Sequence, residues 1–198
     1  IPAWDSLDDD QRTVAARMME VYAGFLEHTD VQIGKVVDEL KAQGIFDNTL
    51  FVYIVGDNGG SAEGGPPGSI NYMGALQGLQ EPLAAQLAGL HQLGGPDSYA
   101  QYPAGWAWAM STPLQWVKQI ASHLGGTRNA MVLSYPAGID TPGQVRSQFG
   151  HVNDIAPTIL DLAGIPMPEV VDGTTQAPLD GVSLQPTFND ADAAEVHH

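Results

Sequence analysis

Cysteine is absent from the 198 residues of this sequence. Disulfide bonds, thiolate metal sites and a cysteine nucleophile are therefore excluded within the chain. Basic residues are scarce, because seven Lys and Arg stand against 23 Asp and Glu, which gives a formal net charge of −16. So few cations cannot form the basic surface that nucleic acids require, and we expect no nucleic-acid partner. The excess of acid is compatible with cation binding, although it more often keeps a surface soluble.

Long apolar runs are also missing. The longest falls short of the ~20 residues that a membrane-spanning helix needs, so we expect no membrane span. No signal peptide is visible, and the compartment stays open. A hydrophobic content of 43% is enough for a folded core. The length suits one domain or a piece of a larger one, and a start at Ile1 rather than Met leads us to expect further residues before it.

A buried strand followed by two oxygen donors stands out early in the chain. Residues 51–55 are apolar without polar alternation, which predicts a strand covered on both faces. The run stops at Gly56, and Asp57 and Asn58 follow directly. Carboxylate and amide oxygens at the C-terminal edge of an α/β sheet suit Ca²⁺ or Mg²⁺. Both residues also form turns well, so the local pattern supports a metal site and a plain turn equally.

Helical and extended patterns alternate along the chain. Apolar residues at steps of three and four between residues 11 and 40 predict an amphipathic helix, or two abutting helices, ending near Gly44. A second buried strand is predicted at 130–134 and a further helix at 154–164. The predicted fold is α/β, with a mostly parallel sheet flanked by helices.

Two segments between the strands carry candidate functional residues. Residues 60–105 form a long excursion directly after the predicted ligand edge, which is typical of a substrate-facing insertion, with a packing decoration as the alternative. Ser111 or Thr112 before Pro113 predicts the start of a helix that carries Lys118. Trp106 and Trp108 are candidates for an aromatic pocket, but tryptophans more often belong to a plain core.

Several passages in order resemble one family, the type I sulfatases of the alkaline phosphatase superfamily. The large insertion and the Gly-Trp-Ala before the lysine segment resemble the bacterial arylsulfatase branch. The matching passages are Asp47-Asn48-Thr49 with Asp57-Asn58-Gly59, Lys118 with Gly125-Gly126-Thr127-Arg128, residues 151–160, and residues 180–184.

The resemblance implies roles for named residues within an alkaline-phosphatase-like sulfatase domain. Asp57 and Asn58 would be two ligands of one divalent cation, usually Ca²⁺, and Lys118 would contact the sulfate oxygens or the leaving oxygen. His123 and Arg128 would face the sulfate or serve the structure. Sulfatases attack with a formylglycine made from Cys, sometimes Ser, in Cys-x-Pro-x-Arg, and no such motif is present.

We therefore predict that residues 1–198 are a later part of an arylsulfatase catalytic domain, with 60–105 as an insertion and without the C-terminal subdomain. The nucleophile and the remaining cation ligands would lie upstream. The segment would act on a small-molecule sulfate ester only in association with the missing part of its own domain, and alone it would be inactive. A phosphodiesterase or phosphonate hydrolase of the same superfamily and a non-catalytic structural or binding fragment stay open.

Overall fold

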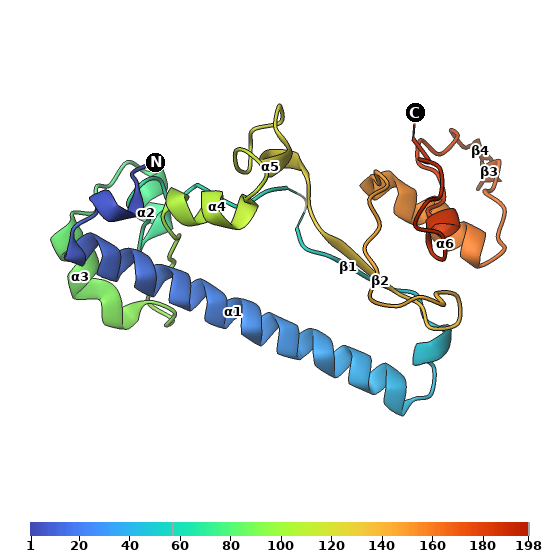
Figure 1. The fold of residues 1–198 in the computed structure, drawn as a ribbon, viewed down its shortest axis with the longest axis horizontal. Coiled ribbons are helices and arrows are strands. Elements are labelled where there is room, and N and C mark those ends of the chain that lie inside the picture. The colour runs from blue at the N-terminus through green and yellow to red at the C-terminus, as the bar shows by residue number, and fades with distance from the viewer. Residues whose placement is uncertain (57, 198) are drawn as a thin grey trace. The chain divides into compact units, whose positions relative to one another are not determined.

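The computed structural model describes residues 1–56 and 58–197, and the chain divides into two compact units (Figure 1). Unit 1 contains Ile1–Ala42 and Val52–Val132, and unit 2 contains Gln43–Phe51 and the chain from Leu133 onward. The described helices are α1 Asp9–Ala42, α2 Tyr72–Leu76, α3 Leu83–Gly89, α4 Ala104–Ser111, α5 Leu124–Thr127 and α6 Ile155–Leu162. The strands are β1 Phe51–Ile54, β2 Met131–Ser134, β3 Val170–Val171 and β4 Thr174–Thr175. Short 3₁₀ turns are η1 Trp4–Ser6, η2 Phe46–Asn48, η3 Leu90–Gln92, η4 Val152–Asp154 and η5 Gln185–Thr187.

The long amphipathic helix is confirmed as α1, a single helix of 34 residues. Its start is closed by a reciprocal pair of hydrogen bonds. The N–H of Gln11 donates to Asp8 Oδ1 at 2.8 Å, and the N–H of Asp8 donates to Gln11 Oε1 at 3.0 Å. This exchange satisfies two amides that a helix start otherwise leaves unpaired. Gly44 follows the helix with a φ of 71°, the left-handed conformation expected just beyond a helix end.

The core of unit 1 forms where the first turns of α1 meet residues 60–105. Trp106 adds a specific link, because its Nε1–H donates to the carbonyl oxygen of Ala15 at 3.0 Å. α3 packs against α1 (Figure 1). Residues after β1 therefore supply much of the apolar interior of this unit. The buried residues of the cluster are Val14, Met18, Leu93, Tyr102 and Ala107.

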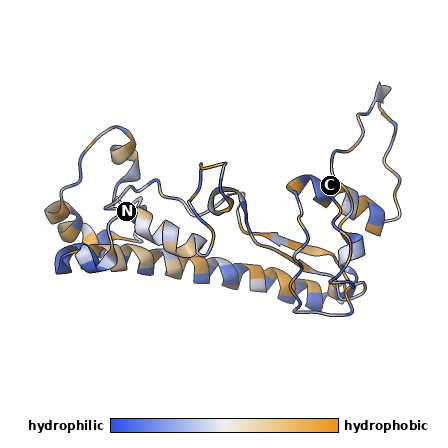
Figure 2. Cartoon of the chain, turned by 45° about the horizontal axis from the view of Figure 1, so that its top comes forward, coloured by the Kyte–Doolittle hydropathy of each residue, from blue (hydrophilic) through white to orange (hydrophobic). Residues whose placement is uncertain are grey.

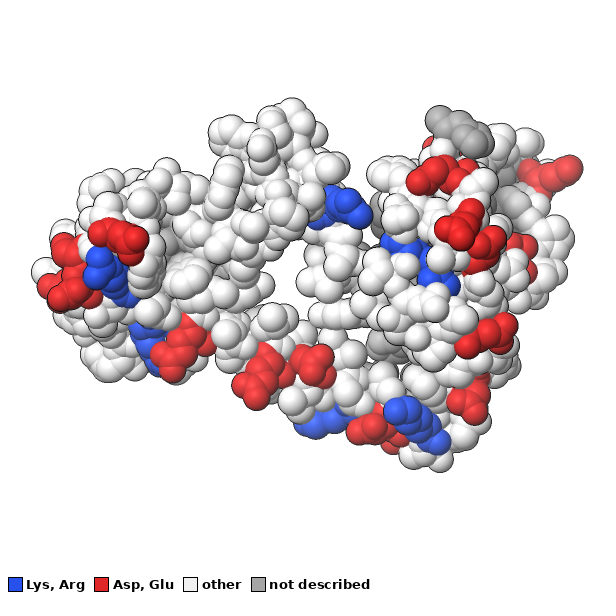
Figure 3. Space-filling view, in the orientation of Figure 1, with Lys and Arg blue, Asp and Glu red and all other residues white. Residues whose placement is uncertain are grey.

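Further along α1 the apolar side chains face solvent. Phe25 is 69% exposed and Val36 is 54% exposed. Figure 2 shows hydrophobic residues recurring over the whole length of the helix. On the face shown in Figure 3, acidic and basic side chains are interspersed along α1 without a basic cluster. None of the described helices combines the length and the apolar character needed to cross a membrane.

Strands are present at both predicted places, as β1 and β2, but the prediction that they are buried is wrong, because Ile54 and Val132 are 39% and 55% exposed. The two strands pair with each other in antiparallel fashion. The N–H of Val55 donates to Ala130 O at 3.3 Å, and the N–H of Ala137 donates to Asp47 O at 2.8 Å. Residue numbers thus rise on one strand as they fall on the other. The short pair β3–β4 is antiparallel as well.

The prediction of a mostly parallel sheet is therefore wrong for the part of the chain that the structure describes. The reason lies in the connection from β1 to β2. The chain leaves β1 and returns at the same end, where the N–H of Gly59 donates to Gly126 O at 3.4 Å. A parallel pair needs a crossover that carries the chain back to the opposite end, and residues 60–126 make no such crossover.

Unit 2 is organised around α6 and the buried carboxylate of Asp154. The helix predicted at 154–164 is confirmed as α6, and Asp154 and His151 form a capping box at the preceding turn η4. Asp154 Oδ2 accepts from the N–H of His151 at 2.7 Å and pairs with His197 Nε2 at 2.7 Å, and Asp154 Oδ1 accepts from the N–H of Val182 at 2.9 Å. Burial alone would raise the pKa of Asp154, but these hydrogen bonds outweigh it and hold the pKa below its ordinary value.

Candidate functional site

Asn58 and Lys118, the predicted site residues that the structure describes, fall in unit 1, after β1 and before α5. Asp57 lies outside the described residues. Asn58 follows it and is half-buried. Lys118 reaches the same region from another part of the chain, because its backbone N–H donates to the carbonyl oxygen of Gly60 at 3.0 Å. The structure thus brings Lys118 to the loop that directly follows Asn58.

Lys118 does not lie on a helix, so that prediction is wrong. α4 ends at Ser111 and α5 begins at Leu124. Between them Trp116 and Gln119 adopt φ values of 69° and 77°, which a right-handed helix does not allow. A left-handed non-glycine residue costs about 1–2 kcal/mol, and such strain tends to gather at functional sites. Trp116 and Gln119, on either side of Lys118, are two such residues.

A close approach of backbones holds the two loops together. The N–H of Gly125 donates to Gln115 O at 2.9 Å, and a Cβ on Gly125 would lie 2.2 Å from that same oxygen. A Cβ on Gly59 would lie 1.6 Å from Gly125 O. Only glycine fits at both positions, so the Lys118 segment and the loop after Asn58 share one tightly packed junction.

The ammonium group of Lys118 is paired with a carboxylate that the sequence did not suggest. Lys118 Nζ lies 3.2 Å from Glu63 Oε1, and the two side chains are 32% and 26% exposed. Glu63 also accepts from Gln119 Nε2 at 3.3 Å and from Ser61 Oγ at 3.2 Å. The side chain of Tyr72 lies close enough to the same carboxylate to interact with it electrostatically. Glu63 is therefore held from several directions at once.

Two tyrosines near Glu63 have raised pKa values. Partial burial, and after it the charge of Glu63, raises the pKa of Tyr72 above its ordinary value, with Lys118 opposing weakly. Burial is also the main reason that the pKa of Tyr102 is raised. A neutral Tyr72 hydroxyl can act only as a donor toward a carboxylate such as that of Glu63.

A small cavity opens beside this ion pair. Its volume is about 210 Å³, room for roughly seven water molecules at about 30 Å³ each. That space suits a tetrahedral oxyanion and the first atoms of the group it is bonded to. The ring of Trp116 lies 6.3 Å from that of Trp108 and 5.6 Å from that of His123, which gives the cavity an aromatic side. The lining residues are Ala62, Glu63, Trp116, Val117, Lys118, Gln119 and Ile120.

A family model for sulfatases matches residues 4–165. The chain belongs to the sulfatase family. It is 37% identical over 166 residues to an uncharacterised sulfatase of Schizosaccharomyces pombe, a match that covers 84% of this chain and 28% of the relative. It is 29% identical over 181 residues to an arylsulfatase of Klebsiella aerogenes, covering 91% of this chain and 37% of that protein. The chain thus spans about a third of the length of these curated relatives.

The remaining candidates of the sulfatase chain are placed less directly. His123 Nδ1 and Ser122 Oγ are 2.9 Å apart, while the His123 ring packs on Trp116. The side chain of Arg128 is exposed, and its backbone N–H donates to Leu124 O at the end of α5. Trp106 belongs to the core of unit 1, as the plain-core alternative predicted.

The described part of the sulfatase chain shows no complete cation site. Among residues 1–56 and 58–197, no group of three or more His, Asp and Glu side chains is arranged to hold a metal ion. The predicted pair Asp57 and Asn58 amounts to at most two protein ligands, whereas Ca²⁺ takes six to eight oxygens. These two predicted ligands therefore do not make up a whole calcium site.

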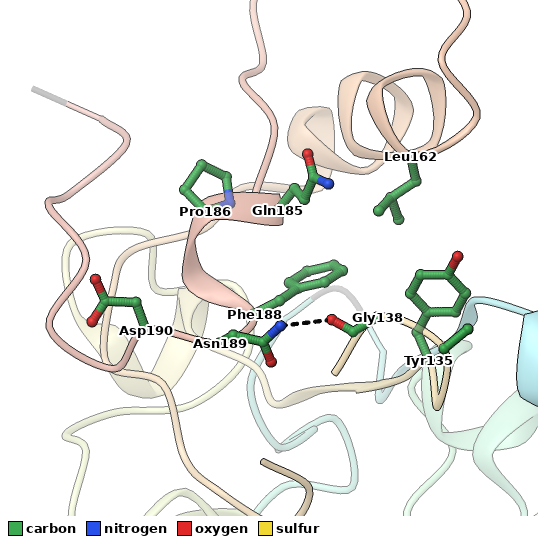
Figure 4. A pocket seen from close by; sticks show the side chains of 9 residues that line it. Tyr135, Gly138, Leu162, Gln185, Pro186, Phe188, Asn189 and Asp190 are labelled. Atoms are coloured by element: carbon green, nitrogen blue, oxygen red, sulfur yellow. Dashed lines mark hydrogen bonds between the residues drawn. The ribbon is translucent and has the colours of Figure 1, made fainter. Parts of the chain in front are cut away.

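A larger cavity of about 540 Å³ lies in unit 2 (Figure 4). Asn189 Nδ2 donates to Gly138 O at 2.9 Å across one side of it. None of its described lining residues is cationic, so it offers no positive charge to a sulfate. The lining residues are Tyr135, Ala137, Gly138, Leu162, Gln185, Pro186, Phe188, Asn189 and Asp190.

Proposed function

We propose that this chain is a later part of an arylsulfatase catalytic domain that hydrolyses small-molecule sulfate esters. The observation that carries the proposal is the hydrogen bond from the Lys118 N–H to Gly60 O, because it holds the lysine to the loop after Asn58. The cavity beside Lys118 supports an oxyanion as the group bound there. The likeness to a Klebsiella aerogenes arylsulfatase supports aryl esters as the substrate class.

Lys118 has a role that follows from its chemistry. When the sulfur–oxygen bond of a sulfate ester breaks, negative charge builds up on the leaving oxygen and stays on the sulfate oxygens. An ammonium group fixed at the wall of a small cavity stabilises that charge more than water does, because little reorganisation is needed. Its three N–H donors are enough to keep Glu63 on one side and a sulfate oxygen on another.

Asp57 and Asn58 are proposed as two oxygen ligands of one Ca²⁺ ion. The ion would need further ligands from residues outside this chain. The formylglycine nucleophile would also come from outside this chain. We therefore expect the 198-residue chain alone to hydrolyse no sulfate ester and to bind the cation weakly.

The proposal is tested by comparing a protein that extends this chain upstream with the chain alone. Each is assayed with 4-nitrophenyl sulfate and with matched phosphate esters. We expect turnover of the sulfate ester by the longer protein only. Appreciable aryl-sulfate hydrolysis by the 198-residue chain would refute the partial-domain proposal.

A phosphodiesterase is the second candidate, and the Lys118–Glu63 pair is the observation that favours it. A cavity whose cation is partly neutralised accepts singly charged oxyanion esters in general, and a phosphodiester carries the same charge as a sulfate monoester. A longer protein that turns over bis(4-nitrophenyl) phosphate and leaves 4-nitrophenyl sulfate intact would be assigned to this second function.

A further inference from the structure

The Glu63 carboxylate is fixed beside the lysine rather than resting there by chance. Its Oε1 faces both Lys118 Nζ at 3.2 Å and Gln119 Nε2 at 3.3 Å, and its Oε2 accepts from Ser61 Oγ at 3.2 Å. Moving the carboxylate away would leave several donors without their partner, so its charge stays next to Lys118 when a ligand enters.

The carboxylate also faces the space that a ligand would occupy. Glu63 and Lys118 line the same cavity of about 210 Å³. Any anion that touches the ammonium group there lies within a few ångströms of the Glu63 charge. At such distances the repulsion between like charges is not fully screened at physiological ionic strength, where the screening length is ~8 Å.

We infer that Glu63 makes this site selective for singly charged esters over doubly charged ones. Glu63 can act in this way only if Lys118 faces the substrate, as in the proposed function. The interaction of an anion with the field of the pair grows in proportion to its charge. The cost of removing that anion from water grows with the square of its charge. A field weakened by Glu63 can therefore offset desolvation for a charge of minus one and fails to do so for a charge of minus two.

The inference predicts a specific change when the charge alone is removed. Glu63→Gln keeps the shape of the side chain and its ability to accept hydrogen bonds, while it removes one negative charge. A dianion then gains twice the free energy that a monoanion gains, so the ratio between the two substrates shifts. We expect a shift of about tenfold in favour of the dianion, equivalent to about 1.4 kcal/mol.

The experiment uses the longer, metal-loaded protein and three aryl esters at pH 8. The first two, 4-nitrophenyl sulfate and bis(4-nitrophenyl) phosphate, carry one charge, and 4-nitrophenyl phosphate carries two. In Glu63→Gln we expect kcat/KM for the phosphate monoester to rise about tenfold relative to both singly charged esters, while the ratio between those two stays within about twofold. Where the monoester is not turned over, its inhibition constant against the working substrate takes the place of kcat/KM.

Two variants separate charge from packing. Glu63→Asp keeps the charge, so its selectivity should follow the wild type even if all rates fall. Glu20→Gln makes the same chemical change on α1, at an exposed glutamate that pairs with Arg17 at 2.8 Å, and should leave every ratio unchanged.

The result that overturns the inference is a Glu63→Gln protein whose three rates change together, because Glu63 would then only hold Lys118 in place. If Glu63→Gln does not fold, Gln119→Lys supplies the same change in net charge at an exposed position 3.3 Å from Glu63. It should shift the ratio in the same direction, and an unshifted ratio again refutes the inference. A wild type that cleaves only phosphodiesters would refute the sulfatase proposal, while the comparison of diester with monoester would still test Glu63.

Discussion

Gly59 faces the carbonyl oxygen of Gly125 so closely that a Cβ on Gly59 would lie 1.6 Å from it. This approach joins the loop after Asn58 to the loop that carries Lys118. Gly59 lies outside any regular element and Gly125 lies in the single turn of α5, and the junction depends on the absence of side chains at both positions.

Gly59→Ala should therefore lower both stability and activity. The added methyl group forces the two loops apart, and overpacking of this kind costs about 1–3 kcal/mol. The displacement also moves Lys118, so kcat/KM for an aryl sulfate should fall. Urea unfolding and steady-state kinetics measure the two effects. The matched control is Gly24→Ala on α1, where a Cβ meets nothing within 4 Å and should stabilise the helix by up to about 1 kcal/mol.

Lys118→Ala should reduce kcat for a sulfate ester by about 10²–10³, the usual effect of removing one group that stabilises developing charge. Lys35→Ala is the control, since Lys35 lies on α1 and donates to Gln32 Oε1 at 3.0 Å, away from the cavity. Circular dichroism should show both variants folded. A Lys118→Ala enzyme with wild-type kcat would remove this lysine from the mechanism.

Asp57→Ala should weaken calcium binding by the longer protein, because it removes a charged oxygen donor from a proposed ligand set. Calorimetric titration with Ca²⁺ measures this directly and does not depend on turnover. Asp38→Ala, which removes an exposed carboxylate from α1, should leave the titration unchanged. Equal affinity in the wild type and in Asp57→Ala would exclude Asp57 as a ligand.

Asp154→Asn should destabilise the protein by about 2–4 kcal/mol near neutral pH, because a buried carboxylate with several hydrogen bonds is replaced by a group that matches them poorly. Since folding lowers the pKa of Asp154 below its ordinary value of 3.8, its contribution to stability is full above that pH. The contribution is lost as the pH falls through the folded-state pKa.

The stability of the wild type should therefore decline in acid below about pH 4, and that of Asp154→Asn should depend less on pH there. Asp161→Asn serves as the comparison, because its exposed carboxylate accepts one hydrogen bond from Ser183 Oγ and a change there should cost no more than about 1 kcal/mol. Identical acid profiles for wild type and Asp154→Asn would contradict this account.

The elements that sequence predicted well are those fixed by local patterns. The apolar steps of α1 and α6 and the apolar runs of β1 and β2 are local signals, and all four elements are present. The direction of the β1–β2 pair is not local. It depends on where residues 60–126 bring the chain back, which no periodicity encodes.

The segment around Lys118 shows the same limit in another form. Proline and the apolar periodicity favoured a helix there. In the structure the backbone of this segment instead forms hydrogen bonds with Gly60 and Gly125, which compete with helical hydrogen bonds. Trp116 and Gln119 adopt left-handed backbone conformations, which interrupt a helix. No sequence pattern links Glu63 to Lys118, because residues 63 and 118 come together only when the chain folds.

The exposed apolar residues of α1 have a practical consequence for anyone who handles the chain in solution. The exposed apolar side chains of Phe25 and Val36 favour association with a second copy of the chain, while the net charge of −16 makes the copies repel each other. Dissolved salt shortens the range of that repulsion from about 30 Å at 0.01 M to about 10 Å at 0.1 M, and it leaves apolar attraction intact. Concentrated stocks should therefore stay monodisperse in dilute buffer and cloud as sodium chloride is added.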